Sequence, residues 1–509
     1  MEKHRHLRLK FTLGSFLGVV VIGLIIFLIV RCGQSQPPTN SSESNASDIT
    51  SQNTSESVQQ HYVYFDLNGY RSIPNPDPQL VDHGDKVMMP GVERLGYTLV
   101  GWTLTPEGGT YWNFTDNLVN ESVTLYAQWT KDVYTITFDL NGGTGATPAN
   151  QAITYLSYND TERTNVLDMP APNTISKDGY ILDGWWIKDD LGNFTQEWNF
   201  ASDLPTSNLT LYAGWGVARE FNHYLYTEYD SAIKITGYND NTYVGGTLLI
   251  PDYISFKPVL SIGENAFNNF SGTDEIDLPD TITTIQSRAF YNCTLISQMA
   301  IHDNVTSIGY LAFANCSNLY EVTLGAKLLN IGAQAFYQCD NLGRFKSIVF
   351  PSSLLSIDTR AFETISSNAL VEGLTFNNGV IYIGPQAFSH ANVTTLTLPN
   401  SVEYIGREAF CYTYELEEIH FGTGLLRIAN HAFYMANNNT PGYLHVYLDA
   451  IVPPELEDAQ CFGPFSAPGG DPSRPGLWFI VPEGTIDAYN DDPMWGLYYH
   501  DRFTYFVIS

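Results

Sequence analysis

The fold is decided by a stretch that reads IGYLAFANCSNLYEVTL from Ile308 to Leu324. Its Ala-Phe pair occurs eight times, each time with an isoleucine four residues before the alanine. A repeat with a nearly constant period predicts one coil per copy, with the same side chains buried in every coil. We expect the repeat core to consist of Phe267, Phe290, Phe313, Phe336, Phe362, Phe388, Phe410 and Phe433, at spacings of 23, 23, 23, 26, 26, 22 and 23 residues.

A short segment with alternating apolar residues lies between successive Ala-Phe pairs, as in Leu319 to Leu324 and Val393 to Leu398. Alternation with period two predicts a β-strand. Gly325 and Pro399 follow these two segments, and such residues end strands. Stacking the strands in register predicts a parallel sheet along one side of a solenoid.

Some coils depart from the pattern. Gln286, Asp358 and Ala429 replace the glycine that follows the isoleucine in other coils. The coils that end near Phe362 and Phe388 carry three extra residues. We expect a local bulge or altered curvature there.

Within each strand, the residues between buried positions point outward and are the candidates for partner binding. The face is regular and partly acidic, which suits a basic or hydroxyl-rich protein surface or a glycan. The alternative is an inert, solvated sheet. The candidate residues are Glu275, Asp277, Gln298, Glu321, Thr323, Thr395, Thr397, Glu418 and His420.

Two clusters invite a metal or redox interpretation, and we favour neither. Glu418, His420 and His445 could meet on adjacent strands, but nothing in the sequence fixes three ligands in tetrahedral geometry. A column of Cys293, Cys316 and Cys339 continues as Phe270 and Ala391 in other coils, so the position tolerates apolar residues and predicts buried free thiols. We therefore expect no metal and no cofactor.

A second kind of repeat occupies residues 61–216. The segment from Tyr64 to Gly69 recurs from Thr137 to Gly142, and both end in an Asn-Gly turn that predicts a hairpin. A Gly-Tyr pair followed by Gly-Trp occurs at 96–102 and again at 179–185, and alternating strands close the copies at 123–129 and 209–215. Carbohydrate stacking and core packing both suit the aromatic residues Trp102, Trp129, Trp185 and Trp215, and a module this small usually uses its aromatics as core.

The Ile-Gly-x-x-Ala-Phe pattern resembles the BspA-type leucine-rich repeat. The F-x-x-N-G opening, the Gly-Tyr and Gly-Trp centre and the Tyr-Ala-x-Trp ending resemble the internalin-type B-repeat, or Listeria-Bacteroides repeat. This resemblance implies small ubiquitin-like or grasp-type β-modules that act as spacers or adhesive elements on cell-surface proteins, without catalysis. The segments 217–261 and 449–509 resemble the terminal caps of the leucine-rich-repeat family.

The N-terminus predicts a membrane anchor. Residues 1–10 carry four Lys or Arg residues, and the run from Phe11 to Val30 has no charge over a length that spans a bilayer as a helix. The basic side should stay in the cytoplasm, which places the chain after Arg31 outside the cell. Two alternatives are a cleaved signal peptide, which would give a secreted protein, and a lipid anchor at Cys32, although Arg31 departs from the small residue expected before such a cysteine.

Composition excludes some functions. The chain has 54 acidic against 24 basic residues, so its formal charge of -30 would repel nucleic-acid phosphate. Six cysteines in 509 residues are too few for a disulfide scaffold, and none forms a C-x-x-C pair. The sequence lacks G-x-S-x-G, H-E-x-x-H, Walker and Rossmann motifs, although a deep pocket with two carboxylates would favour a carbohydrate-active enzyme.

The sequence therefore predicts a mainly β cell-surface protein that binds an extracellular protein or glycan and is not an enzyme. A structural envelope component without a ligand is the main alternative. The expected parts are a cytoplasmic tail (1–10), a transmembrane anchor (11–30), a disordered tether (31–60), two B-repeats (61–130 and 131–216), a cap (217–261), about eight leucine-rich coils (262–448) and a C-terminal cap (449–509).

Overall fold

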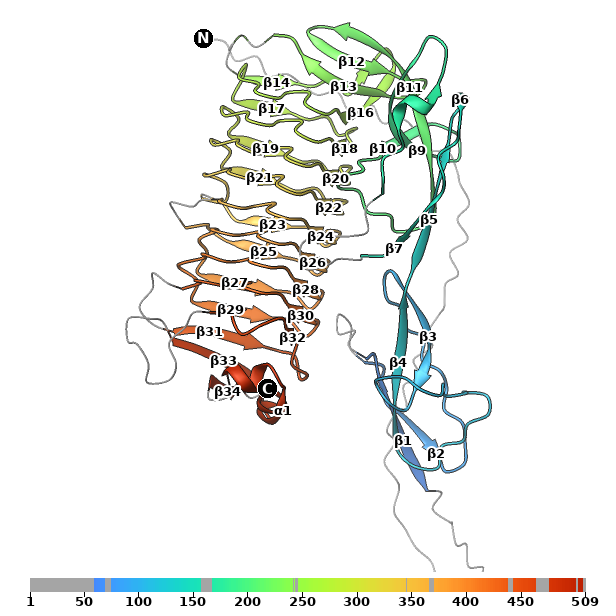
Figure 1. Cartoon of the computed structure of the whole chain (residues 1–509), viewed down its shortest axis with the longest axis vertical. Coiled ribbons are helices and arrows are strands. Elements are labelled where there is room, and N and C mark those ends of the chain that lie inside the picture. Colours follow the sequence, from blue (N-terminus) through green and yellow to red (C-terminus); the bar gives the residue numbers. More distant parts are fainter. Residues whose placement is uncertain are drawn as a thin grey trace, which may run out of the picture. The chain divides into compact units, whose positions relative to one another are not determined.

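The structure is a computed structural model in which two small β-modules precede a solenoid of stacked coils (Figure 1). Its described residues are 59–68, 75–156, 167–240, 242, 246–344, 346–365, 370–437, 443–463, 476–499 and 502–506. The predicted anchor, Phe11 to Val30, lies outside these residues, as do the tail and nearly all of the tether. Across the described part of the chain, no helix combines the length and the apolar character needed to cross a bilayer.

The first small module, residues 60–131, is a four-stranded sheet in the order β2-β1-β4-β3. The central pair β1–β4 is parallel and the two outer pairs are antiparallel. Alternating burial along β1 places Val63 and Phe65 in the core, where the Phe65 ring meets the Trp102 ring edge-on at 5.3 Å. The strands are β1 (Gln60–Asp66), β2 (Gln79–Asp82), β3 (Tyr97–Thr103) and β4 (Val123–Lys131).

The second small module, residues 133–221, repeats this topology and adds a strand, β10, beside β9. Phe138 and Trp185 form the equivalent edge-on ring pair at 5.1 Å. A two-stranded ribbon and a single 3-10 turn (Pro172–Thr174) complete the module. Its strands are β5 (Val133–Asp139), β6 (Thr144–Gly145), β7 (Gln151–Thr154), β8 (Ile175–Ser176), β9 (Ile181–Lys188), β10 (Phe194–Glu197) and β11 (Leu209–Phe221).

The prediction of a tight hairpin at Asn141-Gly142 was wrong, because the strands on either side of this turn do not pair with each other. The turn itself forms, with positive φ at both residues and a bond from the Gly143 N–H to the Leu140 carbonyl of 2.8 Å. The chain then continues into β6, and the antiparallel partner of β5 is β7. Antiparallel pairing and an Asn-Gly turn are both present, but a longer excursion separates the two strands.

Strand β11 connects the second module to the solenoid. Its first half pairs with β5 and β9, and its second half pairs with β12 (Tyr224–Glu228). β12 pairs with β13 (Ile233–Tyr238), which lies parallel to β16 of the first coil. One continuous strand is therefore shared by the module and the start of the solenoid.

The solenoid has two ladders of parallel strands, and both run along its length (Figure 1). The short-strand ladder contains the Ile of each repeat, and the outer ladder contains the alternating segment. After β13, the short-strand ladder comprises β16 (Lys257–Ile262), β18 (Thr284–Ile285), β20 (Ser307–Ile308), β22 (Asn330–Ile331), β24 (Ser356–Ile357), β26 (Tyr382–Ile383), β28 (Tyr404–Ile405), β30 (Arg427–Ile428) and β32 (Glu455–Leu456), with β15 (Tyr253–Ile254) antiparallel to β16.

The outer ladder is divided into three groups of paired strands. The three extra residues of the long coils lie before β23 and β25, which together form the middle group. The short-strand ladder keeps its register past Asp358, with Ile331 opposite Ile357, so the expected irregularity falls on the outer ladder alone. The groups are β14 (Thr247–Leu249), β17 (Glu275–Asp277), β19 (Gln298–Ala300) and β21 (Glu321–Thr323); β23 (Ile348–Phe350) and β25 (Leu374–Phe376); and β27 (Thr395–Leu398), β29 (Glu418–Phe421), β31 (Tyr443–Leu448), β33 (Gly476–Pro482) and β34 (Phe503–Phe506).

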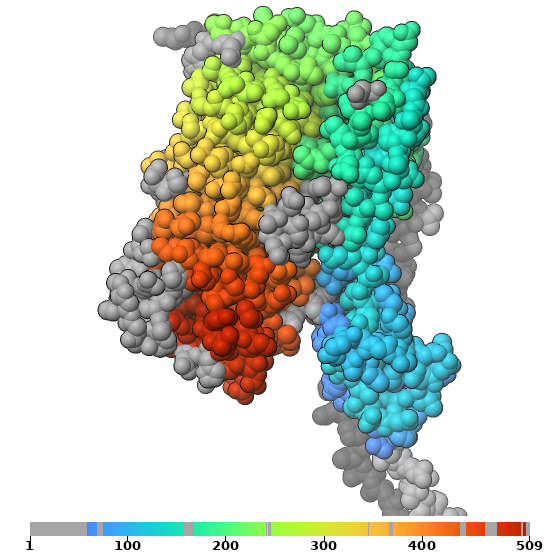
Figure 2. Space-filling model, viewed as in Figure 1, coloured from blue at the N-terminus to red at the C-terminus, as the bar shows by residue number. Residues whose placement is uncertain are grey.

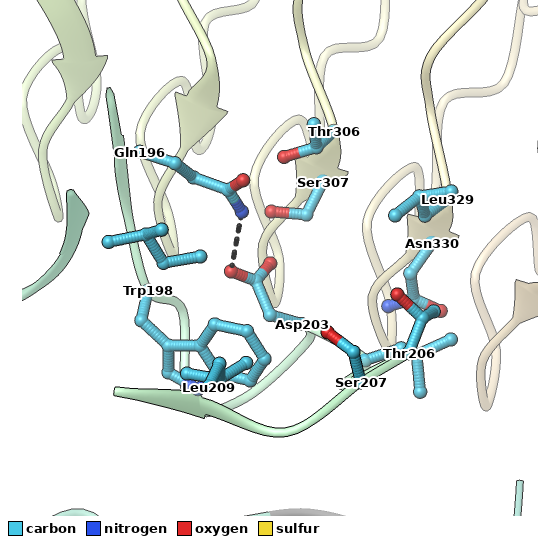
Figure 3. A pocket seen from close by; sticks show the side chains of 12 residues that line it. Gln196, Trp198, Asp203, Thr206, Ser207, Leu209, Thr306, Ser307, Leu329 and Asn330 are labelled. Carbon is cyan, nitrogen blue, oxygen red and sulfur yellow. Dashed lines mark hydrogen bonds between the residues drawn. The ribbon is translucent and has the colours of Figure 1, made fainter. Parts of the chain in front are cut away.

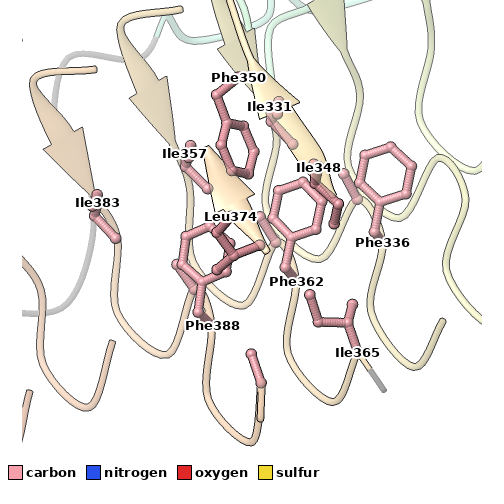
Figure 4. Close-up of a cluster of buried hydrophobic side chains, with 14 of the residues drawn as sticks. Ile331, Phe336, Ile348, Phe350, Ile357, Phe362, Ile365, Leu374, Ile383 and Phe388 are labelled. Carbon is pink, nitrogen blue, oxygen red and sulfur yellow. The ribbon is translucent and has the colours of Figure 1, made fainter. Parts of the chain in front are cut away.

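The core of the solenoid is a stack of phenylalanine rings (Figure 4). The eight rings from Phe267 to Phe433 are buried, and neighbouring centroids lie 5.0 to 5.4 Å apart. Phe462 continues the stack at 5.3 Å from Phe433, so a ninth coil follows the eight that the sequence predicts. Two short helices, α1 (Ile486–Asp491) and α2 (Trp495–Tyr499), close this end, where the Trp495 indole donates to the Pro454 carbonyl at 2.7 Å.

Each coil turns through two residues with left-handed backbone, one before the alanine and one two positions after the phenylalanine. Backbone N–H groups in these turns donate to carbonyls of the next coil. The Leu311 N–H donates to the Ala333 carbonyl at 3.1 Å, and the Phe313 N–H donates to the Ala335 carbonyl at 2.8 Å. These bonds form a third connection along the solenoid. The first set is Asn265, Arg288, Leu311, Gln334, Arg360, Gln386, Glu408 and His431, and the second is Asn269, Asn292, Asn315, Gln338, Thr364, His390, Tyr412 and Met435.

Candidate functional site

The two ladders present different surfaces. The residue that precedes the isoleucine of a short strand is small and polar in Thr284, Ser307, Asn330 and Ser356, and all four side chains are at most 1% exposed. Polar side chains at such positions of a two-layered coil would ordinarily face water. Figure 2 shows the second small module, in teal, against the coils on this side.

Direct bonds join the second module to the short-strand ladder. The Thr284 hydroxyl donates to the Glu197 carbonyl at 3.0 Å, and the Asn330 amide donates to the Ser202 carbonyl at 2.6 Å. At Gly309, an added Cβ would lie 2.7 Å from the Asn199 amide nitrogen, so the module approaches the coil as closely as glycine permits. The small polar column therefore serves as the docking surface for the module.

A buried charge cluster lies at the same junction. The Lys234 ammonium is bonded to the Asp183 carboxylate at 2.5 Å and to the Glu197 carboxylate at 2.9 Å. Burial acts against the charge of Lys234, but the two carboxylates raise its pKa well above its usual range. Burial would raise the pKa of Asp183, yet Lys234 and the bonds from Thr227 and Tyr229 lower it. Burial raises the pKa of Glu197, and the nearby charge of Asp183 raises it further. Lys234 lowers the pKa of Glu197, but the net shift is upward.

The first small module also contacts the solenoid. Arg94 forms an ion pair with Glu403 at 2.9 Å, with side chains only 7% and 8% exposed. The Arg94 guanidinium lies 3.7 Å from the centre of the Tyr97 ring. Burial, with the Glu403 charge nearby, raises the pKa of Tyr97 to about 12, so its hydroxyl stays neutral. An apolar cluster of Tyr155, Leu156, Leu204 and Leu355 fills the space where the two modules and the coils converge.

The sequence-predicted binding residues lie on the outer ladder, with side chains that are exposed or half-exposed. Glu275, Gln298 and Glu321 are cross-strand neighbours, and so are Thr397 and His420. Asp277 and Thr323 occupy the next outward position in the first group, and Thr395 pairs with Glu418 in the third. The structure brings these residues together within two groups of strands, and β23 and β25 separate the groups.

The third group carries an aromatic cluster, and His420 is the one member that sequence reasoning included in its set of binding residues. The His420 and Tyr447 rings stack in parallel at 4.2 Å, and His445 is the cross-strand neighbour of Trp478. Trp478 is 38% exposed and stands on β33, which the sequence placed in a terminal cap. The alternation of Gly476–Pro482 and its parallel pairing with β31 were the signals that could have added it.

The candidate metal cluster consists of Glu418, His420 and His445, and its side chains make a ring stack and an ion pair. His420 Nε2 lies 3.5 Å from the Glu418 carboxylate, while its ring is held against Tyr447. His445 lies opposite Glu418 on the neighbouring strand. Within the described ranges, no group of three His, Cys, Asp or Glu side chains has the geometry to hold a metal ion.

The cysteine column lies inside the coils. Cys293, Cys316 and Cys339 are buried free thiols whose sulfurs contact phenylalanine carbonyls of neighbouring coils at 3.0 to 3.2 Å. Burial raises the pKa of Cys293 and Cys339 well above its usual range, which disfavours the reactive thiolate. These cysteines serve as core residues.

The tryptophans of the small modules pack in their cores. Trp102, Trp185 and Trp215 are at most 3% exposed, and Trp129 packs against the core of the first module. The Trp129 and Trp215 indoles donate to the Leu67 and Leu140 carbonyls at 2.9 and 2.6 Å. Their positions match between the modules, which fits a structural role.

These features define a repeat protein with a solenoid and two small β-modules. The BspA type leucine rich repeat region matches residues 250–369 and 344–441. The Listeria-Bacteroides repeat domain matches residues 61–128 and 134–214. The solenoid coils are therefore BspA-type leucine-rich repeats, and the two small modules are Listeria-Bacteroides repeats, which we call B-repeats below. Nothing in these matches indicates catalysis.

Part of the chain is similar to known proteins. Internalin H of Listeria monocytogenes is 40% identical over 122 residues, which cover 24% of this chain and 19% of that protein. A protein of Evansella cellulosilytica whose name describes it as a membrane protein is 30% identical over 170 residues, covering 33% of this chain and 23% of that protein. The chain thus spans less than a quarter of either relative. A leucine rich cell surface protein of Faecalibacterium prausnitzii is 20% identical, with a TM-score of 0.36 and coverage of 57% and 94% of the two chains.

Proposed function

We propose that this chain is a non-catalytic cell-surface protein that binds an extracellular protein or glycan through the outer ladder. The observation that carries the proposal is the difference between the two sides of the solenoid. Thr284, Ser307 and Asn330 lie against the second B-repeat and Ser356 of the same column is buried, whereas the outward residues of the outer ladder stay accessible. A solenoid that closes one side presents the other as a regular surface for a partner.

The chemistry of the outer ladder supports a partner with basic or hydroxyl-bearing groups. Acidic side chains Glu275, Asp277 and Glu321 occupy the first group of strands, and Lys346 already pairs with Glu321. Glu418, His420 and Tyr447 occupy the third group. Tyrosine and tryptophan on a rigid sheet lose little side-chain entropy on binding and contribute strongly to interfaces. The proposed site comprises Glu275, Asp277, Gln298, Glu321, Thr323, Thr395, Thr397, Glu418 and His420, with Tyr447 and Trp478 added.

We further propose that residues 11–30 anchor the chain in the membrane, with residues 1–10 in the cytoplasm and the B-repeats and solenoid outside. The uncharged run after four basic residues supports this orientation. The name of the Evansella relative, a membrane protein, agrees with a membrane location. In this arrangement the B-repeats lie between the anchor and the solenoid along the chain.

The proposal is tested with the full chain coupled to beads and probed with extracellular proteins and glycan arrays. A face variant, Thr395→Arg with Thr397→Arg, places bulk and positive charge on the outer ladder. A control variant, Asn120→Arg with Thr130→Arg, adds the same charge at exposed positions of the first B-repeat. We expect a partner whose affinity falls by about tenfold or more in the face variant and stays near wild type in the control. If no probe binds, or both variants lose binding equally, the chain is an envelope component or binds elsewhere.

A further inference from the structure

A cavity of about 200 Å³ lies where the second B-repeat meets the short-strand ladder (Figure 3). The B-repeat contributes Gln196, Trp198 and Asp203, and the coils contribute Ser307 and Asn330. Thr206 and Ser207, on the loop before β11, are exposed and form its rim. The cavity is therefore reachable from solvent and lies on the side of the solenoid away from the outer ladder.

Buried polar atoms on several residues that line this cavity have no hydrogen-bond partner within the described protein. They include the Ser307 hydroxyl, the Asn330 side-chain carbonyl and the Trp198 indole N–H, on side chains that are 1%, 0% and 5% exposed. Leaving a buried polar group without a hydrogen-bond partner is unfavourable, because the group has lost its bonds to water. Figure 3 shows Ser307 facing the same space as Gln196 and Asp203. A polar guest that both donates and accepts hydrogen bonds would satisfy these groups.

The charge of the cavity selects among polar guests. Its described lining contains neither Lys, Arg nor His, so an anion would find no counter-charge. Asp203 is the sole lining carboxylate, and it accepts bonds from the Gln196 amide at 3.1 Å and the Asn199 N–H at 3.0 Å. These donors already stabilise its charge, which weakens its attraction for a cation. A neutral guest is favoured.

We propose that this cavity binds one neutral monosaccharide. Sugar hydroxyls both donate and accept, so one can accept from or donate to Ser307 and another can donate to the Asn330 carbonyl. The apolar wall of Ile187, Leu209 and the Trp198 ring suits the C–H face of a sugar ring. The volume equals that of about seven water molecules at roughly 30 Å³ each, which is room for a single ring rather than a chain of sugars.

Binding at this cavity would also join the B-repeat to the coils, because the guest would contact Trp198 from one and Ser307 from the other. The sugar should therefore raise the unfolding temperature of the full chain, and the increase should continue to grow as the sugar concentration exceeds its Kd. This site is distinct from the outer ladder, and its occupancy does not depend on the partner proposed there.

The experiment titrates the full chain with glucose, galactose, mannose and N-acetylglucosamine and follows binding by calorimetry and ligand-observed NMR. We expect at least one sugar to bind saturably at a single site. Ser307→Ala should weaken that affinity about threefold to tenfold without lowering stability, because its hydroxyl makes no bond within the described protein. Ser307→Leu should abolish binding by filling the cavity.

Ser347→Ala, directly before β23 and away from the cavity lining, is the matched control and should leave sugar affinity unchanged. The proposal is overturned if none of the four sugars binds saturably, in which case the cavity holds ordered water alone. It is equally overturned if Ser307→Ala and Ser307→Leu bind sugar as wild type does, because the site then lies elsewhere. Loss of partner binding in the outer-ladder face variant, with sugar binding intact, separates the two proposals.

Discussion

Arg94 and Glu403 are 309 residues apart in the sequence, yet the Arg94 guanidinium donates to the Glu403 carboxylate at 2.9 Å in a buried ion pair. One residue belongs to the first B-repeat and the other to the coil that contains β28. A buried charge pair is sensitive to the loss of one member, because the remaining charge is then left without compensation. The pair therefore reports directly on whether the first B-repeat is docked.

Replacing Arg94 with Met should destabilise the docked state by about 3 to 5 kcal/mol, because Glu403 would stay buried without its partner. The loss should appear as a lower unfolding midpoint and faster proteolysis near the first B-repeat. Arg219→Met is the control. The Arg219 side chain is more than half exposed, so its ion pair with Glu228 should contribute about 1 kcal/mol or less. Equal effects of the two substitutions would mean that the first B-repeat is not docked at Glu403.

Truncating Phe336 to Ala should lower the free energy of unfolding by about 3 to 5 kcal/mol, because it removes a ring from the centre of the stack. Phe256 is fully exposed on the turn between β15 and β16, so Phe256→Ala removes the same atoms without a cavity. That control should change stability by less than about 0.5 kcal/mol. Chemical denaturation of both variants measures the difference, and an unchanged curve for Phe336→Ala would refute the stack.

Arg288 adopts a left-handed backbone with φ of 54°, and its side chain is exposed, so a substitution there tests the backbone rather than the core. Arg288→Gly should stabilise the solenoid or leave it unchanged within about 1 kcal/mol, since glycine adopts this conformation without strain but gains unfolded-state entropy. Arg288→Val should destabilise it by about 1 kcal/mol or more, because a β-branched residue is strained there. Ser287→Val, one residue earlier and outside the left-handed set, should show little change in the same melting experiment.

Replacing Lys234 with Met should cost about 3 to 5 kcal/mol near neutral pH, because Asp183 and Glu197 would lose their shared cation. The deficit should shrink as the pH falls, since burial raises the pKa of Glu197 and lets it take up a proton. In the wild type, the raised pKa of Lys234 means that its contribution is present below the unfolded value of about 10.4 and is lost only as the pH rises through the folded value.

Denaturation of wild type and Lys234→Met across this pH range measures both effects. Lys257→Met is the control, because Lys257 and its partner Glu228 are 26% and 22% exposed, against 7% and 4% for Lys234 and Glu197. It should show a smaller deficit near neutral pH. A Lys234→Met deficit that grows on acidification would contradict the assigned charge cluster.

Periodicity in the sequence was sufficient to predict the solenoid, because each coil buries the same side chains at the same spacing. The Ala-Phe pattern predicted stacked coils, and the rings from Phe267 to Phe433 are stacked. The ninth coil was not predicted because Cys461 occupies the position of the alanine. The Cys461 carbonyl accepts from the Phe433 N–H at 2.7 Å, as the alanine carbonyls do in other coils. Burial and register, rather than the identity of the dipeptide, define the repeat.

Docking of the B-repeats was not predictable from the sequence. Glu197 and Ser202 lie on β10 and the loop after it, and they meet Thr284 and Asn330 through backbone carbonyls that carry no sequence signature. Small polar residues before each isoleucine were compatible with solvent as well as with an interface. The outward residues of the outer ladder followed from alternation, but its division into three groups required the positions of the insertions before β23 and β25.

The most direct test measures how fast single introduced cysteines react with a maleimide, above the background of the buried native thiols. Thr397→Cys stands on the outer ladder and Ser356→Cys stands on the short-strand ladder, where the native side chain is fully buried. We expect Thr397→Cys to react faster by about two orders of magnitude or more, because Ser356→Cys requires local opening. Similar rates at the two positions would show that neither side of the solenoid is closed, and the outer ladder would lose its claim to be the binding face.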